Sequence, residues 1–142
     1  MSLRERTYLV ESRIPKIQYH ATSKDRVASI MKKGLSLPRG KRDVSTHWYG
    51  VPTISTADKA EYAQVYHPSG VLLKIQVLPG AKYLNRSIRS MKKGENLEQS
   101  VDRWIKEAKA AKADGVRVEG MQSTIGNQTI NPRVLKVIGV VE

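Results

Sequence analysis

The sequence predicts an α+β protein with mixed or antiparallel sheets and flanking helices. Two observations lead to this class: alternating apolar stretches typical of strands occur beside stretches with the three-to-four-residue apolar spacing of helices, and their order lacks regular βαβ winding. A chain of 142 residues fits a single domain. We expect residues 1–16 to be an N-terminal extension or edge strand and residues 17–142 to be the core.

The first predicted strand and helix occupy residues 18–34. The strand ends at Thr22, Ser23 is placed to cap the helix, and Gly34 is placed to end it. One side of this helix is apolar, formed by Val27, Ile30 and Met31.

A long loop and a second strand and helix follow. Residues 35–49 carry many charges without periodicity, which is typical of a loop, and loops of that length are often functional. Residues 50–56 are predicted to form a short strand. The next helix covers residues 57–66, with Thr56 as its cap and Asp58 in its first turn.

The second half of the chain is predicted to begin with a strand over residues 71–77, whose apolar residues alternate with polar ones. The longest helix follows over residues 97–113, with Asn96 and Gln99 as a capping pair and Gly115 as its closing residue. Its apolar stripe consists of Leu97, Val101, Trp104, Ile105, Ala108 and Ala111. Further strands are expected around Val116, after Gly120–Asn127, and around Pro132.

The charge balance indicates a polyanionic partner. The chain has 25 Lys and Arg residues against 13 Asp and Glu residues, a net charge of +12. Such a field attracts nucleic acid, the pyrophosphate of a dinucleotide or an acidic protein surface, although a solvated basic face that keeps a small protein soluble has the same composition. The charge is clustered in two segments: Arg26, Lys32, Lys33, Arg39, Lys41 and Arg42, and then Arg86, Arg89, Lys92 and Lys93.

Several chemistries are excluded by composition and motif. The chain has no cysteine, so disulfides and thiolate metal sites are absent, and its three histidines lack metal-ligand spacing. The common nucleotide, zinc-protease and serine-hydrolase fingerprints do not occur. Because no apolar run is long enough to span a bilayer and the N-terminus is charged, we expect a metal-free cytoplasmic protein without a membrane partner.

His20 and Thr22 form a candidate binding pair. Residues two apart on a strand project to the same face, and the helix that follows presents backbone N–H groups beside them. This arrangement suits a ribose and a phosphate. The alternative is that His20 is a hydrogen-bonded structural residue.

These residues begin a series that resembles the small ADP-ribosyltransferases, including short phage-borne members, over roughly residues 17–141. The family shares a His-x-Thr and Gly-Leu opening, a strand entering a helix that carries a tyrosine, and a late strand with a third residue, usually Glu. The matching segments are Tyr19-His20-Ala21-Thr22-Ser23, Gly34-Leu35, Pro52 to Thr56 with Tyr62, Gly70 to Val77, Ala113 to Val118, and Asn131-Pro132.

The resemblance implies that NAD is the substrate and assigns residues to it. His20 and Thr22 match the positions that hold the adenosine-side ribose. Tyr62 is the best match for the aromatic residue that stacks on nicotinamide, with Tyr66 as the second choice, and Ser55 matches a small polar residue at a strand end. Arg39, in the first basic cluster, is expected to contribute to NAD binding.

The third catalytic position remains open between two residues. The family motif places Gln128 at or near it, whereas Glu119 is the nearby acid on the preceding strand. Breaking the nicotinamide–ribose bond develops positive charge on the ribose, which a carboxylate stabilises better than a neutral amide. We therefore expect His20 and Tyr62 to act with either Glu119 or Gln128.

The expected function is mono-ADP-ribosyl transfer from NAD to a host protein or nucleic acid, with release of nicotinamide. We expect a cytoplasmic monomer, in the host cytoplasm if the chain is phage-encoded. A second enzymatic interpretation is an NAD-dependent RNA 2′-phosphotransferase of the same fold. The non-enzymatic alternative is a basic adaptor that binds nucleic acid or a nucleoprotein through charge alone.

Overall fold

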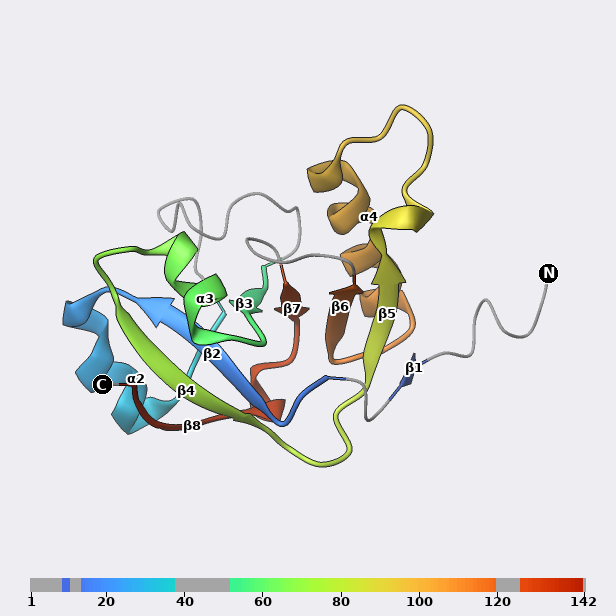
Figure 1. The fold of residues 1–142 in the computed structure, drawn as a ribbon. Coiled ribbons are helices and arrows are strands. Elements are labelled where there is room, and N and C mark those ends of the chain that lie inside the picture. Colours follow the sequence, from blue (N-terminus) through green and yellow to red (C-terminus); the bar gives the residue numbers. More distant parts are fainter. Residues whose placement is uncertain (1–8, 11–13, 38–51, 120–125, 142) are drawn as a thin grey trace.

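A computed structural model describes residues 9–10, 14–37, 52–119 and 126–141 of the chain (Figure 1). It confirms the α+β class with mixed and antiparallel sheets. The strands are β1 (Leu9–Val10), β2 (Ile17–Thr22), β3 (Ile54–Thr56), β4 (Val71–Val77), β5 (Tyr83–Ser87), β6 (Gly115–Glu119), β7 (Asn127–Thr129) and β8 (Leu135–Val140). The helices are α2 (Val27–Lys33), α3 (Ala60–Tyr66) and α4 (Leu97–Ala110), with short 3-10 turns η1 (Lys24–Arg26), η4 (Ile88–Ser90) and η5 (Pro132–Val134).

The strands form two sheets that meet at one point. The five-stranded sheet has the order β1-β5-β6-β7-β3, and the three-stranded sheet has the order β2-β4-β8. Only β5 and β6 pair in parallel among the described strands. A bridge joins the sheets, because the backbone N–H groups of Tyr19 and Ala57 each donate to the other residue's carbonyl at 2.9 Å.

The five-stranded sheet has two faces of different chemistry. Leu84, Val116 and Val118 pack against α4 and form one buried apolar cluster with it. Because side chains alternate along a strand, Tyr83 and Ile54 point the other way. They join Leu73 and Ile75 of the three-stranded sheet in a second cluster. We call this second side of each sheet its inner face, since here the two sheets face one another.

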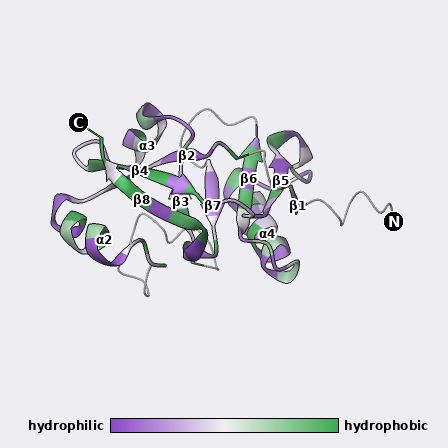
Figure 2. Cartoon of the chain, turned by 90° about the horizontal axis from the view of Figure 1, so that it is seen from below, coloured by the Kyte–Doolittle hydropathy of each residue, from purple (hydrophilic) through white to green (hydrophobic). Residues whose placement is uncertain are grey.

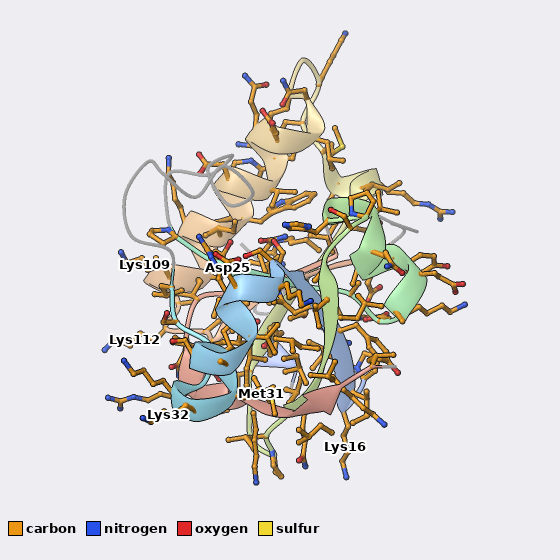
Figure 3. The ribbon with its side chains drawn as sticks, turned by 90° about the vertical axis from the view of Figure 1, so that its left-hand side faces the viewer. Lys16, Asp25, Met31, Lys32, Lys109 and Lys112 are labelled. Atoms are coloured by element: carbon orange, nitrogen blue, oxygen red, sulfur yellow. The ribbon has the colours of Figure 1, made fainter. Side chains whose placement is uncertain are left out.

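Helices cover both sides of the three-stranded sheet. Val27 and Ile30 of α2 pack against the inner cluster, to which Leu73 and Ile75 belong. Helix α3 contacts β2 and β4 and lies on the opposite side of the sheet from α2 (Figure 2). Met31, which was predicted to be on the apolar side of α2, is 48% exposed instead (Figure 3).

Local signals located the elements better than they located the caps. Gly34 ends α2 with φ +84°, as predicted, and Asn96 and Gln99 form the predicted capping box of α4. The cap predicted at Thr56 is wrong, because Thr56 belongs to β3 and α3 begins at Ala60. Ser23 precedes η1, but its side chain accepts no capping hydrogen bond.

The end of α4 also differs from the prediction. The helix stops at Ala110, and Gly115 begins β6 instead of closing the helix. A Cβ at position 115 would approach the backbone of Gln128 and the ring of Tyr83, so glycine is required there for close packing of the sheet and not for a helix cap.

Candidate functional site

His20 lies on the inner face of β2, next to β3. It pairs across the sheet with Leu73, whose side chain is in the inner cluster, so both side chains share that face. Its Nδ1 lies 2.7 Å from the carbonyl oxygen of Ser55. A carbonyl only accepts, so Nδ1 carries a proton and donates it to this hydrogen bond.

Thr22 lies two residues beyond His20 on the same face of β2, as the sequence predicted. It is buried, and it is the last residue of the strand. The backbone of β2 therefore places the imidazole and the hydroxyl on one side of the three-stranded sheet.

Gln128 points away from the inner face, toward the side that α4 covers. It lies opposite Val116 in the pairing of β6 with β7 and opposite Ser55 in the pairing of β3 with β7. Its Oε1 accepts hydrogen bonds from Thr53 Oγ1 at 2.8 Å and Ser55 Oγ at 2.9 Å, and the residue is 1% exposed. Gln128 therefore contributes a buried tie between β3 and β7.

Glu119 ends β6 on the inner face. It lies two residues beyond Arg117, whose guanidinium contacts inner-face residues, so alternation places both side chains on that side. Glu119 pairs with Ser87 at the end of β5 and is partly exposed. The structure therefore places Glu119, and not Gln128, on the sheet face turned toward the strand of His20.

A row of polar side chains crosses the inner face of the five-stranded sheet, two residues before Glu119 along β6. Its members are opposite one another in the strand register: Asn85, Arg117, Asn127 and Thr56. Both polar side-chain atoms of Asn85 and the Nε of Arg117 are buried without a hydrogen-bond partner within the described part of the chain. Unsatisfied buried polar atoms are uncommon in proteins, so this row is suited to a polar contact from another group.

Asp58 connects the polar row to β2. Both Nη atoms of Arg117 donate to its carboxylate at 2.9 Å, and Asn127 donates at 3.0 Å. Gln18, on β2, donates to Asp58 at 2.9 Å and accepts from Thr56 and Asn127. Partial burial raises the pKa of the Asp58 carboxyl, but the hydrogen bonds from Arg117, Gln18 and Asn127 outweigh this effect, and its pKa lies below the usual value.

This network was not predicted from the sequence. Asp58 was assigned to a helix first turn, and Arg117 and Gln18 were not assigned a role. The one sequence signal was that Gln18 stands two residues before His20 with the same strand parity. The network holds β2 against β6 and β7, so it fixes how the strand of His20 is oriented toward the sheet of Glu119.

Tyr62 reaches β2 from the other side. It lies in the first turn of α3, the helix opposite α2 (Figure 2). Its ring is partly buried, and the Lys59 ammonium lies 5.5 Å from the ring centre. The structure therefore does not place Tyr62 on the face of His20, and a ligand that touches both must lie across the edge of β2.

That edge of β2 is open beyond Tyr19. The backbone N–H and carbonyl of Tyr19 point away from β4, toward Ala57, and those of Ala21, two residues on, point in the same direction. Within the described residues, no backbone hydrogen bond closes this edge at Ala21. The backbone N–H and carbonyl of Ala21 therefore offer one donor and one acceptor at this edge, between the face with His20 and the face with Tyr62.

Three further predictions concern metals, Arg39 and the membrane. The described residues contain no group of three or more His, Cys, Asp or Glu side chains that could hold a metal ion. Arg39, which was predicted to contribute to NAD binding, lies outside the described residues. Among the helices that the structure describes, none is long and apolar enough to cross a membrane.

No known family model matches this sequence, and no curated protein matches it either.

Proposed function

We propose that the chain is a mono-ADP-ribosyltransferase that uses NAD as substrate and modifies a macromolecule. The observation that carries the proposal is the open edge of β2 at Ala21, with His20 on one face of the strand and Tyr62 on the helix that covers the other. A carboxamide such as that of nicotinamide offers an acceptor and a donor that match the Ala21 N–H and carbonyl.

The proposed roles follow from the side-chain chemistry. Tyr62 provides an aromatic face for the nicotinamide ring, and the His20 imidazole contacts a ribose hydroxyl. The bond between the ribose C1′ and the pyridinium nitrogen breaks, and nicotinamide leaves with the electron pair as a neutral molecule. Glu119 stabilises the positive charge that develops on the ribose, and the acceptor then attacks C1′ and loses a proton.

The placement of Glu119 and Gln128 supports Glu119 in the catalytic role. Gln128 is buried on the α4 side, and its carboxamide oxygen already accepts hydrogen bonds from the hydroxyls of Thr53 and Ser55. Glu119 is partly exposed on the inner face, so its carboxylate can act electrostatically on a ribose bound at that face.

The test measures nicotinamide release from NAD and transfer of labelled ADP-ribose to macromolecules in a cell lysate. We expect Glu119→Gln to lower both by about 100-fold or more, as removal of one charge-stabilising group in an active site does. His20→Ala should lower both as well. Glu98→Gln is the matched control, because it removes the same charge from an exposed position in the first turn of α4.

Two results would contradict the proposal. One is the absence of both nicotinamide release and transfer with protein and nucleic-acid acceptors. The other is full activity in a folded Glu119→Gln protein together with loss of activity in an equally stable Gln128→Ala protein, which would assign catalysis to the α4 side.

A second candidate, a basic adaptor without catalysis, is favoured by the net charge of +12. It predicts nucleic-acid binding that is unchanged in His20→Ala and Tyr62→Ala and decreases with salt, without any consumption of NAD. An NAD-dependent RNA 2′-phosphotransferase is distinguished by loss of a terminal phosphate from the RNA.

A further inference from the structure

The end of β5 and the connection that follows it to α4 form a basic segment. Between residues 86 and 94 it contains Arg86, Arg89, Lys92 and Lys93 and no acidic residue. The last three of these side chains are exposed. The segment extends past the end of the five-stranded sheet, at the top of Figure 1.

The charges of this segment are only partly neutralised by neighbouring acids. Arg86 lies 3.5 Å from Glu107. Glu95, which follows the segment, is bound by Arg103, whose Nε and Nη2 donate to its two oxygens at 3.0 Å. The described structure shows no ion pair for Arg89, Lys92 or Lys93, and the exposed Glu98 is the next acid along the chain.

The segment begins beside Glu119. Strands β5 and β6 are parallel, so both end at the same edge of the sheet, and Ser87 at the end of β5 pairs with Glu119 at the end of β6. The basic residues after β5 therefore begin at the edge of the sheet where Glu119, the proposed catalytic carboxylate, lies.

We propose that residues 86–93 bind the sugar-phosphate backbone of a nucleic acid and present it as the acceptor at the Glu119 edge. The acceptor role rests on the proposed transferase function, whereas backbone binding does not. Arg and Lys side chains with serine hydroxyls, here Ser87 and Ser90, are the usual contacts to phosphates. Protein interfaces instead depend on clustered apolar and aromatic side chains. The one exposed large apolar side chain of this segment is Ile88.

The binding test compares two triple variants by fluorescence anisotropy, with labelled single-stranded RNA and DNA of about 15 nucleotides. The segment variant is Arg89→Ala with Lys92→Ala and Lys93→Ala. The control removes three exposed lysines of α2 and β8, one of which, Lys32, points away from the protein body in Figure 3: Lys32→Ala, Lys33→Ala and Lys136→Ala.

The expected change follows from counterion release. Each phosphate contact on a single strand contributes about 0.7 to the slope of log affinity against log salt, so loss of three contacts should reduce the slope by about 2. At about 0.15 M salt this corresponds to roughly 50-fold weaker binding. The control variant should retain most of the parent affinity and slope.

Three outcomes would overturn the inference: parent-like binding by the segment variant, an equal loss in the control variant, or stronger binding of polyglutamate than of the oligonucleotides, which would indicate an acidic protein partner.

The effect of the segment on catalysis is measured separately. The segment variant should release nicotinamide from NAD at the parent rate while its transfer of label to added nucleic acid falls. If the parent consumes no NAD but the segment variant still loses nucleic-acid binding, the transferase proposal and the acceptor role fail. The inference that the segment binds nucleic acid then stands by itself.

Discussion

Breaking the ion pair between Asp58 and Arg117 should weaken the contact between the two sheets. Arg117 donates to both carboxylate oxygens of Asp58 at 2.9 Å, and the two side chains are 33% and 18% exposed for Asp58 and Arg117. Loss of one partner from a fully buried pair costs about 3–5 kcal/mol, and exposed pairs contribute about 0–1 kcal/mol. For this intermediate burial we expect Asp58→Ala to lower the free energy of unfolding by about 2 kcal/mol.

A double-mutant cycle in urea isolates the interaction from other effects of each substitution. The proteins are Asp58→Ala, Arg117→Ala and the double variant, and the expected coupling is about 1–2 kcal/mol. The control cycle uses Asp102 and Lys106, which form an i,i+4 pair at 3.0 Å on α4 with Lys106 61% exposed. That pair should couple by only about 0.3–0.5 kcal/mol.

The pH dependence gives an independent check. Because the pKa of Asp58 is lowered in the folded protein, its contribution to stability is complete above the unfolded value of about 3.9 and is lost as the pH falls through the folded value. The coupling should therefore decrease at acidic pH. A coupling at neutral pH no larger than that of Asp102 and Lys106 would refute the reasoning, because it would make the ion pair an ordinary surface contact.

Two further substitutions test other parts of the structure. Hydrogen bonds from Arg103 and Ser100 lower the pKa of Glu95 to about 2, so the parent should lose stability as the pH falls from about 4.5 toward 2, and melting temperatures should show a smaller loss in Arg103→Gln. Gly115→Ala should lower the free energy of unfolding by about 2–3 kcal/mol through overpacking, whereas the control Gly139→Ala, which meets no atom within 4 Å, should be near neutral. Equal unfolding midpoints in urea for the two alanine variants would contradict the packing argument.

The features that the sequence predicted well are short-range. The capping box of α4 depends on Asn96 and Gln99, three residues apart, and both of its hydrogen bonds form. The end of α2 depends on the single backbone conformation at Gly34. Residues this close in the chain are brought together by the helix itself, so their types are sufficient to predict the contact.

The features that the sequence did not predict are contacts between distant segments. Thr56 has the residue type of a helix cap, but its hydroxyl donates to Gln18, 38 positions earlier. Asp58 stands near the start of a helix, but its carboxylate binds Arg117, 59 positions later. In both cases a tertiary partner takes the place of the local one, and no spacing rule links residues so far apart.

The choice between Glu119 and Gln128 shows why strand register decides a site. The two residues are close in the sequence, and the resemblance to the ADP-ribosyltransferases points to the neighbourhood of Gln128. A shift of one residue along a strand exchanges the two faces of a sheet, so Asn127 lies in the polar row while Gln128 lies on the α4 side.

The same alternation places Glu119 with Arg117 on the face turned toward β2, where Gln18 and His20 lie. The hydrogen bonds that tie Gln18 to Asn127 and Asp58 thus fix the orientation of the His20 strand toward the Glu119 strand. A proposed active site composed of residues 99 positions apart therefore depends on this buried network. In the proposed transferase, Asp58 and Arg117 would act as positioning residues, whose loss lowers turnover through geometry and leaves the chemistry of the imidazole and carboxylate unchanged.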